Sequence, residues 1–330
     1  MNIAINGFGR IGRAVLKIAL ERGMNVVVIN DVHGVDDAVY LLKYDSIYGR
    51  YKGEVIGERG SFSVNGKKIK VLNEMDPAKL PWKQLKVDVV VESTGIFRDR
   101  EGAKKHLKAG AKYVLISAPA EKADVTVVLG VNDKMLNKDT RIISVASCTT
   151  NCLAPIVRIL NDNFGIEHGM MTTAHGYTND QALHDGFHKQ KRRGRAAALN
   201  IVPTSSGATE AINEVFPELK DKIKGVALRV PVAAGSIVDF VAQLRRSFDI
   251  ISVNGALRKA ANGSMKGILE YTTDEIVSSD VLGNSHSAVV DGLSTMKEGN
   301  LVKVLAWYDN EYGYSSRVVD VIGMLNKWIK

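Results

Sequence analysis

The first 31 residues place a strand, a glycine-rich turn, a helix and a second strand in an order that strongly restricts the fold. The apolar run 2–6 leads directly into Gly7-Phe8-Gly9-Arg10-Ile11-Gly12, and apolar residues then recur at helical spacing up to Arg22. A second apolar run, 24–29, is followed by Asp31. Such glycines let the backbone approach a pyrophosphate at the helix N-terminus, and the acid accepts hydrogen bonds from an adenosine ribose. The segment predicts dinucleotide binding; the alternative is an ordinary strand–helix–strand unit with a glycine-rich turn.

Strands and helices alternate through the rest of the first half. The expected strands are 86–92, 113–117, 125–129 and 141–145. A helix is expected over 98–109, where Gly110 ends it. This alternation predicts an α/β domain with a parallel, doubly wound sheet of the Rossmann type. Residues 61–72 differ, because Asn65-Gly66 separates two alternating runs and so predicts an antiparallel hairpin.

The second half carries longer strand patterns that alternate apolar and polar residues. The expected strands are 169–177, 226–230, 236–244, 288–291 and 301–308, and the expected helices are 153–164, 204–215, 253–261 and 314–330. Long strands of this kind predict an α+β catalytic domain with a mostly antiparallel or mixed sheet. We therefore expect a dinucleotide-binding domain at 1–147, a catalytic or substrate domain at 148–313, and a C-terminal helix at 314–330 that packs back on the first domain.

A candidate nucleophile, Cys148, lies where a strand pattern passes into a helical pattern, between the hydroxyl residues Ser147 and Thr149. Free backbone N–H groups and the helix dipole at such a position stabilise a thiolate. The alternative is a buried cysteine that acts as a small apolar side chain. His175 ends the strand pattern 169–175 and is the best available base beside such a nucleophile. Taken alone, a histidine at a strand end is more often structural than catalytic.

Composition narrows the classes of protein. No apolar stretch approaches the roughly 20 residues that span a bilayer, and the first residues lack the charged region of a secretory signal, so we expect a cytoplasmic chain without a membrane partner. The two cysteines, without a nearby histidine pair, argue against a disulfide framework and a structural metal site. A net charge of +8 favours anionic partners. The basic run 188–195 lacks interleaved aromatics, so small phosphates or a subunit contact are preferred over nucleic acid as the main partner, and a solvated loop is the alternative.

The chain resembles the phosphorylating glyceraldehyde-3-phosphate dehydrogenases over nearly all of its length. The resemblance is carried by Ile-Asn-Gly-Phe-Gly-Arg-Ile-Gly-Arg (5–13), Leu-Lys-Tyr-Asp-Ser (42–46), Ser-Ala-Pro-Ala (117–120), Ala-Ser-Cys-Thr-Thr-Asn-Cys-Leu-Ala-Pro (146–155), His-Gly-Tyr-Thr-Asn-Asp-Gln (175–181), Arg-Val-Pro-Val (229–232) and Trp-Tyr-Asp-Asn-Glu-Tyr-Gly-Tyr-Ser (307–315). The cysteine motif is very specific to this family.

The resemblance implies oxidation of D-glyceraldehyde 3-phosphate to 1,3-bisphosphoglycerate in glycolysis or gluconeogenesis. Cys148 would attack the aldehyde to give a thiohemiacetal, His175 would take the proton, hydride would pass to NAD, and inorganic phosphate would release the thioester. The residues implied in substrate and phosphate binding are Ser147, Thr149, Thr178, Arg193, Ser206, Gly207 and Arg229. Those implied in cofactor binding are Gly7, Gly9, Arg10, Ile11, Gly12, Asp31, Ser117 and Asn310. The resemblance also implies a homotetramer.

Several positions depart from the family pattern, mostly on the coenzyme side. Gly186-Phe187 stand where the family commonly has Leu-Pro, Met75 replaces a basic residue, and His33-Gly34 follow the acid. These changes weaken the steric argument for strict use of NAD, whereas Asp31 still opposes the 2′-phosphate of NADP by like charge. We expect NAD, with NADP use left open. Ser206 replaces threonine and keeps the hydroxyl.

Two other functions stay open at this point. Erythrose-4-phosphate dehydrogenases share the cysteine and the histidine, but Thr178, Arg193 and Arg229 together favour the three-carbon substrate. An RNA-binding or surface-adhesion role through the basic run 188–195 would be a second activity, and the sequence does not exclude it.

Overall fold

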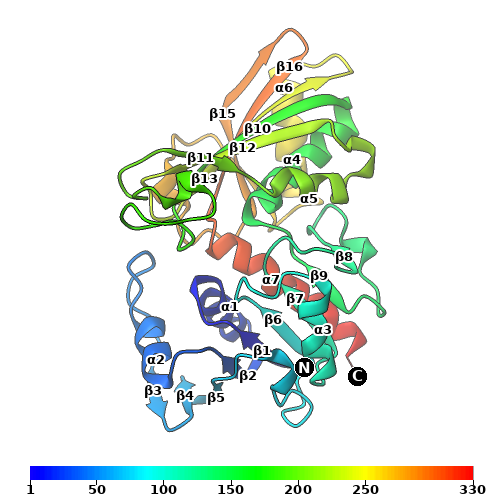
Figure 1. The fold of residues 1–330 in the computed structure, drawn as a ribbon. Helices are drawn as coiled ribbons and strands as arrows, with labels where there is room; N and C mark the ends of the chain where they lie inside the picture. Colours follow the sequence, from blue (N-terminus) through cyan, green and yellow to red (C-terminus); the bar gives the residue numbers. More distant parts are fainter. Residues whose placement is uncertain (330) are drawn as a thin grey trace. The chain divides into compact units, whose positions relative to one another are not determined.

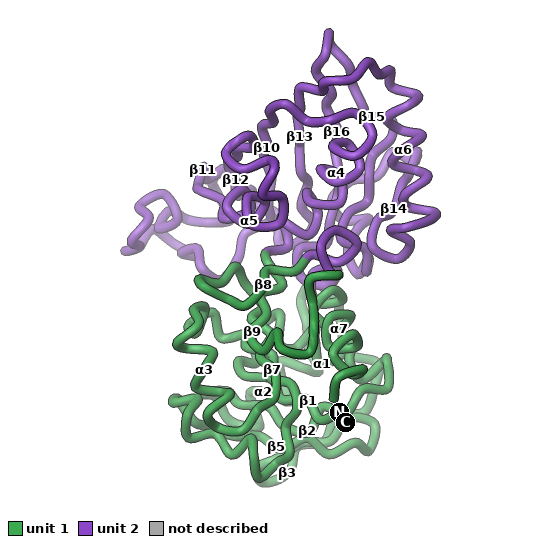
Figure 2. Tube along the Cα trace, turned by 90° about the vertical axis from the view of Figure 1, so that its right-hand side faces the viewer, with its two compact units in different colours: residues 1–127, 134–146, 315–330 green, residues 128–133, 147–314 purple. Residues whose placement is uncertain are grey.

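A computed structural model describes residues 1–329, and the chain forms two compact units (Figure 2). Unit 1 comprises residues 1–127, residues 134–146 and the described chain from Ser315 onward. Unit 2 comprises residues 128–133 and 147–314. Among the described residues, no helix combines the length and the apolar character that crossing a membrane requires.

Unit 1 is built on a nine-stranded sheet with the strand order β3-β4-β5-β2-β1-β6-β7-β9-β8 (Figure 1). Its strands are β1 (Asn2–Asn6), β2 (Asn25–Asn30), β3 (Val55–Glu58), β4 (Ser61–Val64), β5 (Lys67–Leu72), β6 (Val89–Glu92), β7 (Tyr113–Ile116), β8 (Val125–Thr126) and β9 (Ile142–Ser144). Its helices are α1 (Arg10–Glu21), α2 (Val35–Lys43), α3 (Arg100–Lys108) and the part of α7 (Tyr312–Leu325) from Ser315 on.

The strands β5, β2, β1, β6, β7 and β9 run parallel, which confirms the predicted doubly wound sheet. From β1 the chain moves to β2 on one side, and later from β6 to β7 on the other side. Right-handed crossovers in opposite directions put α1 and α3 on opposite faces, so the central strands are buried on both. The strand order reverses beside β1, and the carboxyl ends of the strands at such a point are where these sheets bind ligands.

The predicted hairpin is present. Strands β4 and β5 pair antiparallel, and the turn residues Asn65 and Gly66 have φ values of 48° and 78°. Two consecutive left-handed residues are what a two-residue hairpin turn requires, and Asn-Gly supplies them at low cost. Strand β5 then joins the parallel sheet beside β2.

Unit 2 contains a seven-stranded sheet with the order β11-β12-β10-β13-β16-β15-β14. Its strands are β10 (Ile166–Gly176), β11 (Val202–Ser205), β12 (Ile223–Val230), β13 (Ser236–Leu244), β14 (Leu269–Thr272), β15 (Ala288–Glu298) and β16 (Leu301–Tyr308). Its helices are α4 (Cys148–Phe164), α5 (Ala208–Val215) and α6 (Ile250–Asn262). Single-turn 3-10 helices are η1 (Pro77–Lys79), η2 (Asp133–Met135), η3 (Lys191–Gly194), η4 (Pro217–Leu219), η5 (Ser278–Val281) and η6 (Asn326–Trp328) along the whole chain.

The sheet of unit 2 is mixed, as predicted, because β10–β12 and β14–β15 pair parallel while the other pairs are antiparallel. Along β13 fully buried residues alternate with partly buried ones, so one face of the strand points to the core. Helix α4 packs against this sheet and contacts both α5 and α6. The start of α4 is therefore held by the sheet that carries β10 and β12.

Several helix boundaries differ from the prediction: α3 and α6 differ slightly at their ends, and three other helices differ more. Helix α4 begins at Cys148 rather than at Leu153, because Ser147 caps it. The helix expected over 204–215 covers only Ala208–Val215, and residues 202–205 form β11, an edge strand, where proline is tolerated. The C-terminal α-helix runs over Tyr312–Leu325; of the predicted helix 314–330, Lys330 lies outside the described residues.

Candidate active site

Cys148 is the first residue of α4, at a sharp change from strand to helix. Ala146 has a φ of 52°, a left-handed conformation that is strained for alanine. The Oγ of Ser147 then accepts the N–H of Thr150 at 3.0 Å and caps the helix. This turn brings the sulfur close to the backbone N–H groups of Cys148 and Thr149, both of which lower the pKa of the thiol.

The cysteine and the predicted base lie together. The Sγ of Cys148 is 3.4 Å from Nε2 of His175, although the two residues are 27 positions apart in the chain. His175 is the penultimate residue of β10 and is only 4% exposed, while Cys148 is partly exposed. A nucleophile and a base at hydrogen-bond distance form the arrangement that covalent catalysis requires.

Arg229 lies on the other side of the imidazole, because the parallel register of β10 and β12 pairs it directly with His175. Its Nη1 is 2.8 Å from Nδ1 of His175 and 3.1 Å from the carbonyl oxygen of Gly176. Nδ1 also lies 2.6 Å from that carbonyl oxygen. A guanidinium only donates, so its contact needs an unprotonated Nδ1, whereas the carbonyl contact needs Nδ1–H. In the tautomer that carries its proton on Nδ1, the lone pair of Nε2 faces the sulfur of Cys148.

Burial sets the protonation of both groups. It lowers the pKa of His175 from 6.5 to about 3, with the positive charge of Arg229 as the next cause. It also raises the pKa of the Cys148 thiol, against the lowering effects of Arg229 and the helix N–H groups. The expected effect of the helix N-terminus is thus present but is outweighed by burial. These shifts hold the pair as a thiol beside a neutral imidazole.

A hydroxyl cluster supports the pair from behind. The buried Tyr308 hydroxyl hydrogen-bonds the Oγ1 of Thr149 at 2.9 Å and of Thr173 at 2.8 Å. Its ring also meets the His175 ring edge-on, with 5.9 Å between the centroids. Tyr308 therefore ties the first turn of α4 to β10. Sequence reasoning quoted the motif that contains Tyr308 but gave the residue no role; its position at the end of an apolar strand was the available signal.

The second cysteine is inert by comparison. Cys152 lies one helical turn beyond Cys148 and is fully buried, and its Sγ is 3.7 Å from the carbonyl oxygen of Ala306. Burial raises the pKa of Cys152 well above the ordinary thiol value. This environment is typical of a structural cysteine rather than of a reactive thiol.

The predicted phosphate-binding residues gather around the end of β10 and the loop that follows. Arg193, in η3, pairs with Asp180, and its Nε donates to Thr204 at 2.9 Å. Ser206 and Gly207 follow Thr204 closely in the sequence, and Gly207 is the N-cap of α5, which has no side-chain cap hydrogen bond. Guanidinium groups, hydroxyls and uncapped N–H groups are the donors that phosphate prefers.

Two other predicted site residues, Thr178 and Asn310, make hydrogen bonds to neighbouring residues of unit 2. Thr178 lies in the loop just past β10, where its N–H donates to Oε1 of Gln181 at 3.4 Å. Asn310 is 5% exposed, and its Oδ1 accepts the N–H of Gly235 at 3.1 Å and the hydroxyl of Ser236 at 2.9 Å. These two bonds fix the orientation of the Asn310 amide within unit 2.

In unit 1 the glycine turn fits a bound pyrophosphate. Gly7 has a φ of 92°, and a Cβ there would lie 2.6 Å from the backbone N of Thr94. A Cβ on Gly12 would lie 2.2 Å from the carbonyl oxygen of Gly7. Gly9 caps α1 without a side chain, has nothing within 4 Å of an added Cβ, and is followed by a first turn without acids. The N-terminus of α1 is therefore open to an anion.

Two other predicted cofactor residues follow the carboxyl ends of parallel strands in the same sheet. Asp31 follows β2, and its carboxylate accepts the N–H of Phe8 at 2.6 Å and that of His33 at 3.1 Å. Ser117 follows β7, where its N–H and hydroxyl both donate to the carbonyl oxygen of Glu92. The side chain of Arg10 instead pairs with Asp45 at 2.8 Å, so Arg10 and Ile11 offer a nucleotide their backbone. Together these groups fit a dinucleotide.

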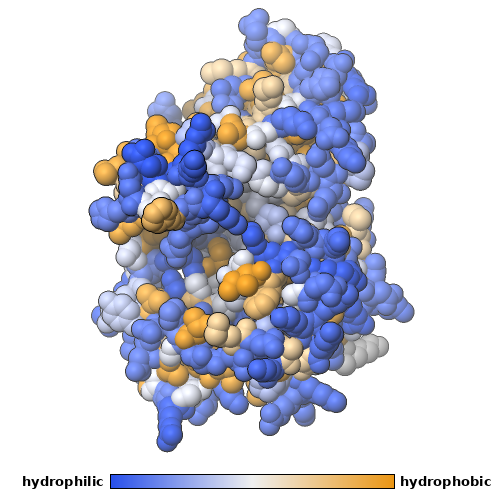
Figure 3. All heavy atoms as spheres, in the orientation of Figure 1, coloured by the Kyte–Doolittle hydropathy of each residue, from blue (hydrophilic) through white to orange (hydrophobic). Residues whose placement is uncertain are grey.

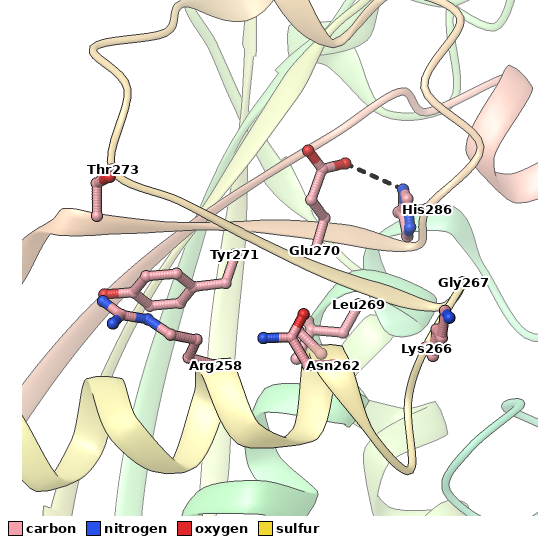
Figure 4. Close-up of a pocket in the computed structure, with 10 residues that line it drawn as sticks. Arg258, Asn262, Lys266, Gly267, Leu269, Glu270, Tyr271, Thr273 and His286 are labelled. Carbon is pink, nitrogen blue, oxygen red and sulfur yellow. Dashed lines mark ion pairs between the residues drawn. The ribbon is translucent and has the colours of Figure 1, made fainter.

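Unit 2 also contains a cavity of about 470 Å³ that carries none of the predicted site residues. Figure 4 shows the Arg258 guanidinium along the Tyr271 ring, 4.8 Å from its centroid, and Glu270 turned toward His286. The Glu270–His286 pair is 3.0 Å apart. The lining of this cavity has no cysteine and none of the residues that the proposed chemistry needs.

Comparison with known proteins gives a consistent assignment. Residues 1–100 match the family model for the glyceraldehyde 3-phosphate dehydrogenase NAD binding domain, and residues 147–310 match the model for the C-terminal domain. The chain is 52% identical to a glyceraldehyde-3-phosphate dehydrogenase of Borreliella burgdorferi, with 99% of this chain and 100% of the relative covered. It is also 52% identical to glyceraldehyde-3-phosphate dehydrogenase 1 of Bacillus subtilis, with 99% and 98% covered. The chain therefore belongs to the glyceraldehyde-3-phosphate dehydrogenase family.

Proposed function

We propose that the protein oxidises D-glyceraldehyde 3-phosphate to 1,3-bisphosphoglycerate with NAD and inorganic phosphate. The observation that carries the proposal is the 3.4 Å approach of Cys148 Sγ to Nε2 of a buried, neutral His175. Alternative chemistry that needs no covalent adduct would not require a thiol and a base at this distance. Membership of the family supports the same reaction.

The residues of unit 2 perform the covalent steps. The sulfur adds to the aldehyde carbon while Nε2 of His175 takes the thiol proton, which gives the oxyanion of a thiohemiacetal. The backbone N–H of Cys148, at the start of α4, stabilises the developing oxyanion. Bound NAD supplies the hydride acceptor. Oxidation leaves a thioester on Cys148; a phosphate oxygen then attacks its carbonyl carbon, and the departing thiolate recovers its proton from Nε2 of His175.

Two anion sites would serve this chemistry. We assign the substrate's phosphate to Thr178, Arg193 and Arg229. The attacking phosphate would contact a set that shares hydroxyls, a bare backbone and one guanidinium. This set comprises Ser147, Thr149, Arg193, Ser206 and Gly207. Because Arg193 is already paired with Asp180, its guanidinium is positioned before an anion arrives.

Coenzyme choice and assembly complete the proposal. NAD is preferred because the Asp31 carboxylate repels a 2′-phosphate, and use of NADP is to be measured. A homotetramer is supported by exposed apolar side chains on the loop 182–201, namely Leu183, Phe187, Leu199 and Ile201. Figure 3 shows such apolar groups among polar ones on unit 2. The glycolytic role would place the protein in the cytoplasm.

One assay tests the reaction. Absorbance of the reduced nicotinamide is followed with glyceraldehyde 3-phosphate or erythrose 4-phosphate, with each coenzyme, and with or without phosphate. We expect fast turnover with the three-carbon substrate and NAD, a strong dependence on phosphate, and loss of activity in Cys148→Ser with NAD binding retained. Undiminished activity in Cys148→Ser would refute the mechanism, and preference for erythrose 4-phosphate would refute the substrate. Asp31→Ala should raise the NADP-to-NAD activity ratio.

A further inference from the structure

A buried chain of polar groups lies behind the glycine turn of unit 1. At its centre is Glu92, the last residue of β6, which is 2% exposed. Its Oε2 accepts the Asn6 side-chain amide at 2.6 Å and lies 3.0 Å from Nε2 of His106, which is fully buried. Its Oε1 accepts both the backbone N–H, at 2.8 Å, and the hydroxyl of Thr94.

The contacts of His106 show which of its ring nitrogens carries the proton in this group of polar residues. The indole N–H of the buried Trp82 points at Nδ1 of His106, 2.9 Å away. An indole nitrogen only donates, so Nδ1 is the acceptor and the ring proton is on Nε2, where it donates to Glu92. The carboxylate therefore receives four donors, and Trp82 fixes the tautomer and the orientation of the imidazole that supplies one of them.

The residues that Glu92 holds form the two walls of the Gly7 turn. Asn6 directly precedes Gly7, and its Oδ1 accepts the side-chain amide of Asn30, the residue before Asp31, at 2.6 Å. On the other wall, Thr94 is adjacent to Ser93, whose hydroxyl donates to the carbonyl oxygen of Gly7 at 2.7 Å. The close approach of Thr94 to Gly7 is the same contact that leaves no room for a Cβ.

We propose that Glu92 is a positioning residue of the NAD site, an inference that rests on NAD binding by unit 1. Its carboxylate holds Asn6 and Thr94 so that the Gly7 turn and Asp31 are in place before the nucleotide arrives. Trp82 and His106 keep the carboxylate in that orientation. A buried carboxylate is costly unless it is fully hydrogen-bonded, and here all its donors belong to the turn or to its support.

The test uses Glu92→Gln, which keeps the shape but replaces one accepting oxygen with an N–H₂ group. The new N–H₂ group then faces either Asn6 and His106 or Thr94, all of which are donors. A buried donor without an acceptor costs enough free energy to weaken binding by about tenfold or more. We expect the Kd for NAD, measured by titration calorimetry, to rise by at least about tenfold, while kcat at saturating NAD stays within about threefold of the parent.

Asp88→Asn is the matched control. Asp88 precedes β6, accepts the backbone N–H of Asn2 at 2.8 Å and pairs with Lys112 at 2.8 Å, so it joins the opposite ends of the same strands. This variant should lower the resistance to urea without changing the Kd for NAD. A folded Glu92→Gln variant whose Kd for NAD lies within twofold of the parent would overturn the proposal.

Trp82→Phe decides the question if Glu92→Gln does not fold, because it keeps the carboxylate and removes only the donor that fixes His106. A rise of at least about threefold in the Kd for NAD supports the proposal, and an unchanged Kd refutes it. Titration with NAD contains no aldehyde or phosphate, so failure of the proposed dehydrogenase reaction would leave this result interpretable.

Discussion

The buried imidazole of His175 makes a quantitative prediction about stability and pH. Burial and the Arg229 cation lower its pKa from 6.5 to about 3 in the folded chain. Between those two values the unfolded chain binds a proton at this site and the folded chain does not, so stability falls as the pH drops. The two pKa values give a loss of about 2 kcal/mol in the free energy of unfolding from pH 7 to pH 5.

His175→Asn removes this titration, and the fall between pH 7 and pH 5 should therefore be about 2 kcal/mol smaller in the variant than in the parent. Urea unfolding followed by circular dichroism at both pH values measures the difference, with equal m values as the check that the same transition is compared. His184→Asn, on an exposed loop, controls for the loss of one imidazole. If the His175→Asn variant lost as much stability as the parent, the argument from burial would be wrong.

Two further substitutions test the geometry. Gly7→Ala should lower the free energy of unfolding by more than about 2 kcal/mol, because its φ is 92° and its Cβ would meet Thr94, and a smaller change in chemical denaturation would contradict the turn. Tyr308→Phe should cost about 2 kcal/mol, because Thr149 and Thr173 share its buried hydroxyl, and near-parental stability would show that these threonines find other partners.

Much of unit 1 could be predicted from the sequence, because its turns depend on the conformational preferences of single residues. The Gly7 turn and the Asn65-Gly66 hairpin need left-handed backbone, which glycine and asparagine supply, so the residue types themselves point to the geometry. The parallel sheet followed from the same reasoning, since buried strands alternated with helices. Non-local pairing was less accessible. Residues 202–205 are held extended by pairing with β12, and no local pattern separated them from the helix that follows.

In the active site, too, local features could be predicted from the sequence and non-local contacts could not. Cys148 could be placed at a helix start from its neighbours, but its distance from His175 depends on the register of a sheet formed later in the chain. Arg229 entered the prediction only through the family resemblance, as a phosphate-binding residue, and its pairing with His175 across β10 and β12 was not predicted. Glu92 was interpreted as the end of a strand. Its burial could not be inferred, because buried carboxylates are rare and their partners lie far away in sequence.

The different exposure of the two thiols makes it possible to measure the fraction of correctly folded molecules by thiol titration. Cys148 is partly exposed, whereas Cys152 is fully buried between α4 and β16. A thiol reagent should therefore consume one equivalent per intact chain and two after denaturation. In any preparation, the ratio of these titres would report what fraction of the protein still has its reactive centre assembled.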